Sequence, residues 1–448
     1  MKICIVSQYF PPRIIGGGEY AADMTAKALA KQGQNVDVLT SHPRLLHSSN
    51  LRQEIPIHEV KDNIVIHRIL GLRTLKFSSV DLTIFSERLL FFLYSFFVTI
   101  SFVKNEKTDI IHAMNIESIP SSIMAARLCG IPIVVTINSN VTMCPKGDFI
   151  NAEGNICHDK CGILSAKKCL FAKFQYRPWR AILFLEAFIW YFMVRLFASS
   201  ADKIIAISSY VKEALIKKGI ASQKIEVIPE MISLDFLKEK GNIPSAENGF
   251  ASSLRDKSVL YAGAIFDYRK GSHVLIEAMP IVLKELPNTK FIIAGTVPKK
   301  EKRLIEEKNL SKNIVFTKLI PREKMPAIYD ISDVVVFPNV APEPFGLVLT
   351  ETMGRKKPVI ASNIGGIPEI VKNEVNGLLV TPNDANDLAK AIVRILTDEK
   401  LAKKLSESGS LTVKERFSEQ TILRKLITVY QELLGGVKVT TNSMKEAI

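Results

Sequence analysis

A strand, a proline-containing loop and a helix follow one another in residues 334–376, and this unit constrains the fold more than any other stretch. The β-branched run at 334–336 predicts a buried strand, and apolar residues at helical spacing from Leu347 onward predict a helix. Three prolines between 338 and 344 interrupt the pattern and predict the loop between them. A strand that leads through a loop into a helix is the repeating unit of α/β proteins.

The two glutamates of this unit are expected in different places. Glu343 precedes Pro344, which disfavours helical geometry at the residue before it, so Glu343 should be extended in the loop. Glu351 should lie about one and a half turns inside the helix. Free backbone N–H groups and the helix dipole favour an anion at the helix start near Phe345-Gly346. We therefore expect a phosphate there, a ribose on Glu351 and a sugar on Glu343; the alternative is two solvated surface acids.

The composition allows two domains and favours an anionic partner. The chain has 448 residues, 47% of them hydrophobic, which is enough for two cores. Its first residues predict a strand and not a signal peptide, so we expect a cytoplasmic protein with reduced or metal-bound cysteines. The net charge of +14 predicts attraction to nucleic acid, anionic lipid or nucleoside diphosphates. Because no nucleic-acid-binding motif occurs, we expect no nucleic-acid partner.

Strand and helix patterns alternate along the rest of the chain and imply two parallel sheets. The first unit is a strand at 3–7, the glycine run Gly16-Gly17-Gly18 and a helix over 20–31. Glycines before a helix let backbone N–H groups approach a phosphate, although a flexible turn is the alternative. We expect a Rossmann-like domain at 1–229, a linker at 230–257, a second Rossmann-like domain at 258–418, a last helix at 419–434 and a frayed tail at 435–448.

Two strongly apolar helices are expected in the first domain. The stretch 89–103 has no charge but is too short to span a bilayer, so it should be buried or should dip into a surface. The stretch 181–198 follows several basic residues, and Trp179 and Trp190 are the two tryptophans of the chain. Aromatic and basic residues beside an apolar helix suit a membrane interface; burial in the core or in a dimer contact is the alternative.

Four cysteines lie in one polar loop, which we place at 138–177. Thiolates in such a loop could hold a structural zinc ion, although the spacing is not that of paired zinc knuckles. Reduced structural thiols are the alternative. The candidate ligands are Cys144, Cys157, Cys161 and Cys169.

The glutamate pair carries a family resemblance. Glu343 and Glu351 enclose Phe-Gly-Leu and are followed by Pro358-Val359 and Pro368-Glu369, and this pattern resembles the signature of the family-4 retaining glycosyltransferases of the GT-B fold. The resemblance implies two doubly wound domains that face each other across a cleft, with the last helix crossing back to the first domain. It also implies metal-independent transfer of a hexosyl unit, with retention of configuration, from a UDP- or GDP-sugar to a cell-envelope, polysaccharide or lipid-linked glycan, on the inner face of the membrane.

The resemblance further implies a set of site residues. A glycine pair lines the donor diphosphate site in this family, and a lysine before a glycine neutralises the departing diphosphate. The donor-binding residues are then expected to be Gly16, Gly17, Arg269, Lys270, Glu343, Phe345, Gly346, Leu347 and Glu351, and the catalytic residues Glu343, Lys270 and Asn138.

The chain departs from the family pattern in three places. Gly263-Ala264 stands where many members have Gly-Arg, and Arg269 could replace the lost cation. Asn138 stands where a histidine is common, and an amide cannot take a proton at neutral pH. Glu230-Met231 replaces Asn-Gly, which we interpret as a difference in the linker. A non-catalytic nucleotide-sugar-binding protein and a nucleotide-sugar 2-epimerase of the same fold stay open as alternatives.

Overall fold

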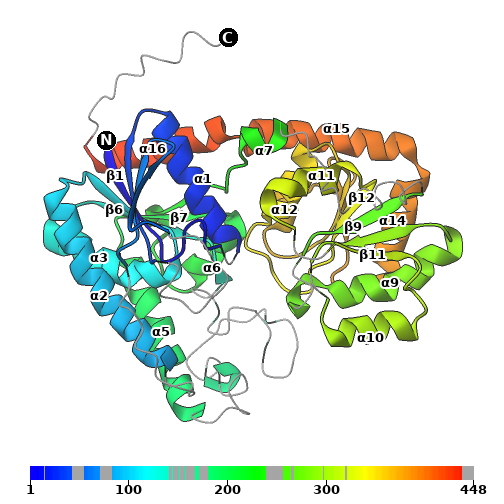
Figure 1. Cartoon of the computed structure of the whole chain (residues 1–448), viewed down its shortest axis with the longest axis horizontal. Coiled ribbons are helices and arrows are strands. Elements are labelled where there is room, and N and C mark those ends of the chain that lie inside the picture. Colours follow the sequence, from blue (N-terminus) through cyan, green and yellow to red (C-terminus); the bar gives the residue numbers. More distant parts are fainter. Residues whose placement is uncertain are drawn as a thin grey trace, which may run out of the picture.

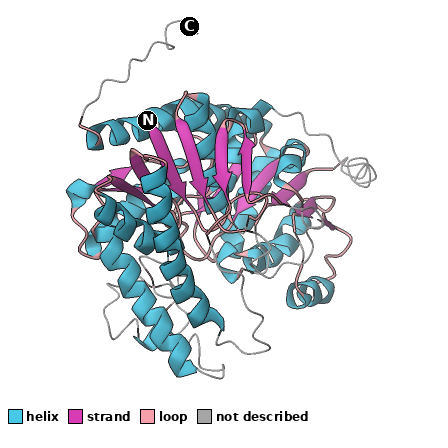
Figure 2. Ribbon diagram, turned by 60° about the vertical axis from the view of Figure 1, so that its left-hand side comes forward, coloured by secondary structure: helices cyan, strands magenta, loops and turns pink. Residues whose placement is uncertain are grey.

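Two β-sheets, each covered by helices, form the two halves of the chain (Figures 1 and 2). The computed structural model describes residues 1–14, 16–42, 55–70, 83–140, 144, 151, 157, 167–170, 180–238, 256–263, 267–295, 297–317 and 320–435. Within these residues, the two doubly wound α/β domains predicted from the sequence are confirmed.

The first sheet has eight strands in the order β3-β4-β2-β1-β5-β6-β7-β8. All neighbouring strands are parallel except β3 and β4. Strands β5 and β6 are buried along their whole length, because helices cover both faces of this part of the sheet. The strands are β1 (Lys2–Val6), β2 (Asn35–Leu39), β3 (His58–Lys61), β4 (Ile64–His67), β5 (Ile110–Ala113), β6 (Ile133–Ile137), β7 (Lys203–Ala206) and β8 (Ile225–Val227). The helices are α1 (Gly17–Lys31), α2 (Thr83–Asn105), α3 (Ile119–Cys129), α5 (Arg180–Ser199) and α6 (Ser209–Lys217).

Strand β3 has no counterpart among the predicted strands. It pairs antiparallel with β4 through a two-residue turn, Asp62-Asn63, and both turn residues have positive φ angles, 53° and 62°. Asp and Asn are among the residues that adopt such turns. Because β3 lies at the sheet edge and most of its side chains are exposed, no apolar alternation marks it in the sequence.

The second sheet has six strands, all parallel, in the order β11-β10-β9-β12-β13-β14. Counted from its own first strand this is the order 3-2-1-4-5-6 of dinucleotide-binding folds, with its switch point between β9 and β12. The strands are β9 (Ser258–Tyr261), β10 (Lys290–Ile293), β11 (Ile314–Phe316), β12 (Val334–Phe337), β13 (Val359–Ser362) and β14 (Leu378–Val380). The helices are α9 (Ser272–Glu285), α10 (Lys299–Glu307), α11 (Met325–Asp330), α12 (Leu347–Gly354), α13 (Ile367–Ile370), α14 (Ala385–Thr397) and α15 (Glu399–Arg416).

Two short segments connect the domains. Helix α7 (Leu234–Lys238) lies within the predicted linker and contacts α12; residues 239–255 lie outside the described residues. The last helix, α16 (Glu419–Leu433), returns to the first domain beside α1 (Figure 1). Leu426 and Tyr430 of α16 join the same buried cluster as Ile5 of β1. The chain is therefore tied to its first domain at both ends.

Helices α2 and α5 extend from the first domain (Figure 1). One side of α5 is buried, with Trp190 and Val194 in the core, whereas Leu196 of α5 and Phe97 of α2 are each 66% exposed. Trp179 lies outside the described residues. In the part of the chain that the structure describes, no helix is long and apolar enough to span a membrane.

Candidate active site

A cleft of about 630 Å³ lies between the two domains. Its size is in the range of small-molecule sites, which occur preferentially at domain interfaces. The residues that line it come from both domains: Tyr9, Gly16, Gly17, Gly18, Glu19, Asn115, Ile116, Glu117, Asn138, Ser139, Asn140, Ile207, Glu230, Ala262, Gly263, Arg269, Lys270, Phe337, Asn339, Ala341, Pro342, Glu343, Pro344, Phe345, Gly346, Leu347 and Val348.

The lining segments follow the carboxyl ends of strands. In the first domain they come after β1, β5, β6, β7 and β8, and in the second after β9 and β12. Strands β1 and β5 are neighbours, and so are β9 and β12, so each domain presents the point where its strand order reverses. Ligands of open parallel sheets bind at such points.

The starts of two helices meet across the cleft. Gly16 is the N-cap of α1 and Gly346 is the N-cap of α12. A Cβ atom on Gly17 would lie 3.2 Å from the Leu347 side chain of the other domain, so the two helix starts are in near contact. Gly346 has a φ of 110°, which favours glycine. Two helix N-termini that face one cleft provide backbone N–H groups and dipoles for an anion.

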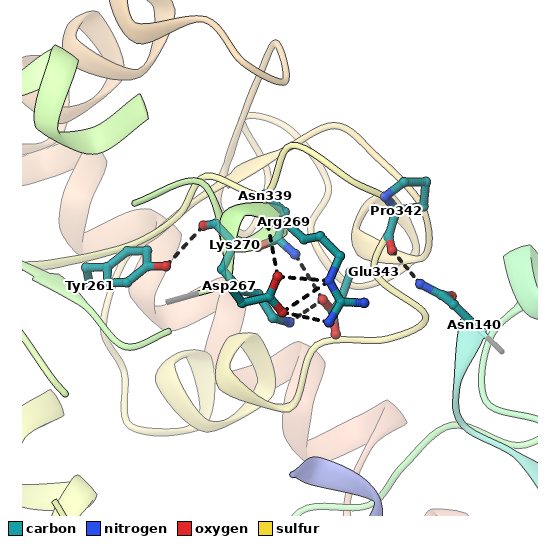
Figure 3. Close-up of polar contacts among 8 residues, drawn as sticks. All are labelled: Asn140, Tyr261, Asp267, Arg269, Lys270, Asn339, Pro342 and Glu343. Atoms are coloured by element: carbon teal, nitrogen blue, oxygen red, sulfur yellow. Dashed lines mark hydrogen bonds and ion pairs between the residues drawn. The ribbon is translucent and has the colours of Figure 1, made fainter. Parts of the chain in front are cut away.

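The side chains of Glu343 and Lys270 form an ion pair inside the cleft, at 2.5 Å (Figure 3). Asn339 Nδ2 donates a second hydrogen bond to the same carboxylate oxygen, at 2.9 Å. The Lys270 ammonium also lies 5.5 Å from the centre of the Phe337 ring, and its backbone carbonyl accepts from Tyr261 Oη. The three polar groups Glu343, Lys270 and Asn339 therefore converge beside the start of α12, although Asn339 was missing from the predicted site.

Arg269 lines the cleft, but its guanidinium is paired with Asp267 (Figure 3). Arg269 Nε and Nη2 donate to both carboxylate oxygens, at 2.7–3.1 Å. Burial opposes ionisation of Asp267, but the hydrogen bond and charge of Arg269 outweigh it and lower the pKa of that carboxyl. The charge of Arg269 is thus largely compensated, which weakens the idea that it replaces the missing family arginine. Ala264 lies outside the described residues.

Glu351 is buried beneath the cleft and does not line it. Its carboxylate pairs with Arg322 at 2.5 Å and accepts a hydrogen bond from Tyr329 Oη at 2.8 Å. Burial raises the pKa of Glu351, and the Arg322 charge and the Tyr329 hydrogen bond oppose this shift. Arg322 in turn stacks on the Tyr20 ring of the first domain, 4.1 Å from its centre. Ribose binding by Glu351 stays a prediction, and it requires Arg322 to move or to share the ligand.

Glu230, which the sequence analysis interpreted only as a difference in the linker, lines the cleft. Burial, followed by the charge of Glu343, raises the pKa of Glu230 to about 8. Among the described residues, no hydrogen bond to its side chain is found. Its position after the strand β8 was a signal that could have placed it at the cleft, because the lining segments all follow strand ends.

Asn138, predicted as catalytic, and Phe345, predicted as donor-binding, also reach the cleft, in two different ways. Asn138 follows β6, donates to the Met114 carbonyl at 3.3 Å and packs against Gly18. The Phe345 side chain is buried and packs edge-on against Phe417, with ring centres 5.6 Å apart, so it positions the backbone at the start of α12. The catalytic and binding roles assigned to these residues stay predictions.

The cysteine loop is described only in part. Cys144 is buried, Cys157 and Cys169 are partly buried, and none of the three forms a disulfide with a described residue; Cys161 lies outside the described residues. Within the residues that the structure describes, no group of three His, Cys, Asp or Glu side chains could hold a metal ion. The predicted four-cysteine zinc site is therefore not tested.

Family comparisons agree with this arrangement. Residues 15–236 match the model for Glycosyltransferase Family 4, and residues 245–411 match the model for Glycosyl transferases group 1. The chain therefore belongs to the family-4 glycosyltransferases of the GT-B fold, as the glutamate signature indicated.

Relatives and solved structures extend the likeness to the whole chain. An uncharacterized glycosyltransferase of Methanocaldococcus jannaschii is 24% identical over 97% of this chain and 100% of its own length. The capsular polysaccharide biosynthesis glycosyltransferase CapM of Staphylococcus aureus is 29% identical over 55% of this chain and 66% of its own. The crystal structure of Anabaena HepE with UDP-glucose has a TM-score of 0.67 at 19% identity and covers 96% of this chain and 100% of its own.

Proposed function

We propose that the chain transfers a hexosyl unit from a nucleoside diphosphate sugar to a cell-envelope, polysaccharide or lipid-linked glycan, with retention of configuration. The observation that carries this proposal is the pair of helix starts that face each other beside Lys270 and Glu343. An anion-binding site next to a hydroxyl-binding carboxylate matches the two ends of a sugar diphosphate.

The comparisons support the choice of donor and acceptor classes. The HepE structure contains UDP-glucose, and the name of CapM places that relative in capsular polysaccharide biosynthesis. We infer a UDP- or GDP-sugar as donor here, and a growing glycan as acceptor. The base, the sugar and the linkage are questions for the donor screen described below.

The proposed reaction breaks the bond between the anomeric carbon and the phosphate oxygen, forms a bond from that carbon to an acceptor hydroxyl oxygen on the same face of the sugar, and passes the hydroxyl proton to the departing diphosphate. The transition state resembles an oxocarbenium ion, and negative charge develops on the departing diphosphate. Lys270 and the N–H groups at the starts of α1 and α12 are placed to stabilise that charge, so we propose that no metal ion is required. Activity that survives EDTA treatment is the expected result.

A donor screen tests the proposal. Purified protein is incubated with UDP-glucose, UDP-galactose, UDP-N-acetylglucosamine and GDP-mannose, with and without glycan acceptors, and release of the nucleotide is measured. Glu343→Ala and Glu351→Ala should abolish turnover, whereas Glu374→Ala, which removes an exposed C-terminal-domain glutamate paired with Arg394, should not. Full activity in Glu351→Ala would contradict the assignment of the donor site.

The same screen separates the alternatives. Tight binding of a nucleotide sugar without turnover in any mixture would favour a non-catalytic binding protein. An epimerised sugar formed without acceptor would favour a nucleotide-sugar 2-epimerase. Glycoside formation only when acceptor is present is the outcome expected of the transferase.

We further propose that the protein works on the cytoplasmic face of an anionic membrane. Helices α2 and α5 each present exposed apolar side chains, Lys167 and Lys168 are exposed, and the net charge is +14. Apolar area combined with basic charge is the pattern of peripheral membrane binding.

The structural zinc ion also remains a proposal for the cysteine loop. Metal analysis of the purified protein tests it, with one equivalent of zinc expected. Its loss in Cys161→Ser is the second expected result.

A further inference from the structure

The loop that carries Glu343 is held by the opposite domain. Asn140 Nδ2 donates to the Pro342 carbonyl at 3.0 Å (Figure 3), and Ser208 Oγ donates to the Pro344 carbonyl at 2.6 Å. Asn140 follows β6 and Ser208 follows β7, so both belong to the first domain. The two accepting carbonyls flank Glu343 directly.

The same loop is held from its own domain by Gly365 and Gly366. Gly366 N donates to the Glu343 carbonyl at 2.7 Å. A Cβ atom on Gly366 would lie 2.4 Å from the Pro344 carbonyl oxygen, and one on Gly365 would lie 2.6 Å from the backbone of Glu343. All three carbonyls of residues 342–344 therefore accept a hydrogen bond, one from the second domain and two from the first.

The two side chains that donate across the domain interface, Asn140 and Ser208, are buried, so water does not replace the carbonyls that accept from them. Asn140 is 6% exposed and Ser208 is 1% exposed. Asn140 Oδ1 is buried with no hydrogen-bond partner among the described residues. The amide therefore contacts the loop through its N–H group and not through its oxygen. Nearby, the Glu369 carboxylate of the second domain accepts the backbone N–H groups of Ser209 and Tyr210 at the start of α6, at 2.7 and 2.6 Å.

We propose that Asn140 and Ser208 are positioning residues that couple closure of the domains to the placement of Glu343. With the domains together, the carbonyls on both sides of Glu343 are held from the first domain; with the domains apart, the loop keeps its second-domain contacts, which include the hydrogen bonds from Gly366 N, Lys270 and Asn339. Glu343 then reaches the sugar only when the cleft is closed around the donor, which limits premature hydrolysis. The catalytic part of this inference rests on the proposed function, in which Glu343 holds the donor sugar.

The test uses Asn140→Ala and a matched control, Asn313→Ala. Asn313 Nδ2 also donates to a proline carbonyl, that of Pro287, but within the second domain and away from the cleft. Hydrogen exchange of backbone amides at 339–346, kcat, donor KM and Tm are measured for the wild type and both variants. The donor is the best substrate of the four-sugar screen.

In Asn140→Ala we expect faster exchange in the loop and a kcat lowered roughly ten- to a hundredfold, with donor KM within about threefold, because the reacting groups are misplaced while the C-terminal-domain contacts remain. Asn313→Ala should match the wild type in loop exchange and in kcat. Unchanged loop exchange and kcat in Asn140→Ala would overturn the inference. If loop exchange were faster in Asn140→Ala but the wild type itself showed no turnover, the result would contradict the proposed function. It would still support the inference that Asn140 holds the loop.

A second variant separates positioning from stability. Asn140→Asp keeps the shape of the side chain, but its carboxylate cannot donate to the Pro342 carbonyl until it is protonated. The activity of Asn140→Asp relative to the wild type should therefore rise as the pH falls toward about 4–5. A ratio that does not change with pH contradicts the role of the Asn140 donor even if Asn140→Ala is poorly folded.

Discussion

Glu230, Glu343 and Glu351, three of the glutamates at or beneath the cleft, differ in what surrounds them. Glu343 is paired with Lys270 in the cleft, and Glu351 is paired with Arg322 beneath it. Glu230 lies in the cleft, where no hydrogen bond from another described residue reaches it. The same residue type therefore has different partners and a different electrostatic environment at each of the three positions.

Glu230 should make stability and donor binding depend on pH. Its pKa is raised to about 8, first by burial and then by Glu343, so the folded protein holds this proton up to a higher pH than the unfolded chain does. The free energy of unfolding should therefore fall as pH rises from about 4.5 to about 8. Glu230→Gln should match the wild type at pH 5 and should unfold a few degrees higher at pH 9.

Thermal unfolding of the two proteins between pH 5 and pH 9 measures this difference. Parallel profiles would contradict the raised pKa. Binding of UDP gives a second readout, because ionised Glu230 adds negative charge to the cleft in which we propose that the diphosphate binds. Above pH 8, the affinity for UDP should weaken more in the wild type than in Glu230→Gln.

Lys270 should act mainly on the chemical step. Negative charge grows on the diphosphate as the bond breaks, so an ammonium beside it stabilises the transition state more than the bound donor. Lys270→Ala should lower kcat by roughly a hundredfold or more, with a smaller change in donor KM. Steady-state kinetics against Lys290→Ala, a lysine of β10 outside the cleft, measures the effect. If Lys270→Ala raised the donor KM and left kcat unchanged, Lys270 would contribute to binding of the ground state and not to the chemical step.

At the scale of elements, α16 is fixed to the first sheet by one buried polar contact. His112 of β5 hydrogen-bonds to Tyr430 Oη of α16 at 2.6 Å and to Thr136 Oγ1 of β6 at 2.7 Å. Burial lowers the pKa of His112 to about 3, so the ring stays neutral in the folded protein. The contact joins two strands of the sheet to the last helix of the chain.

Tyr430→Phe should lower the free energy of unfolding by about 1–3 kcal/mol, because a buried ring nitrogen of His112 loses its partner. Urea unfolding at pH 7.5 measures this, with Tyr268→Phe as a control at a tyrosine that is 57% exposed. An equal effect of both substitutions would contradict the role of the buried contact.

The same histidine predicts an acid-sensitive fold. The pKa of His112 is lower in the folded protein than in the unfolded chain. The stability that neutral His112 contributes is therefore fully present above about pH 6.5 and is lost as the pH falls toward about 3. His112→Gln should be less stable than the wild type at pH 7.5, and that difference should shrink at pH 5. Urea unfolding at the two pH values measures it, and a difference that does not depend on pH would contradict a neutral buried ring.

At the scale of the whole molecule, the proposed membrane attachment rests on the net charge of +14 and on the exposed apolar side chains of α2 and α5. We expect the protein to float with liposomes that contain phosphatidylglycerol at low salt and to be released at high salt. Phe97→Ser combined with Leu196→Ser should weaken this binding roughly tenfold or more, because each removes apolar area available for burial. Leu411→Ser, at a 54% exposed position on α15, is the matched control. If the wild type does not float with these liposomes, membrane binding by α2 and α5 is contradicted.

Much of the fold could be predicted from local sequence because strands and helices follow short-range patterns. The β-branched run at 334–336 falls in β12, the apolar residues from Leu347 onward fall in α12, and the glycine run at 16–18 leads into α1. These features depend on neighbours within a few residues. Strand β3 shows the limit of this reasoning, because an exposed edge strand needs no apolar alternation.

The sequence by itself determined that Gly16, Lys270 and Glu343 follow strand ends, and parallel sheets bring such ends to one edge. Only the tertiary structure decided the partners: Asp267 for Arg269, Arg322 for Glu351, and two first-domain donors for the loop of Glu343. The physical reason is that most of these pairs join segments far apart in the chain. The Arg322–Glu351 distance depends on how the second domain folds, and the contacts of the two first-domain donors depend on how the two domains pack; no local pattern of residues records either.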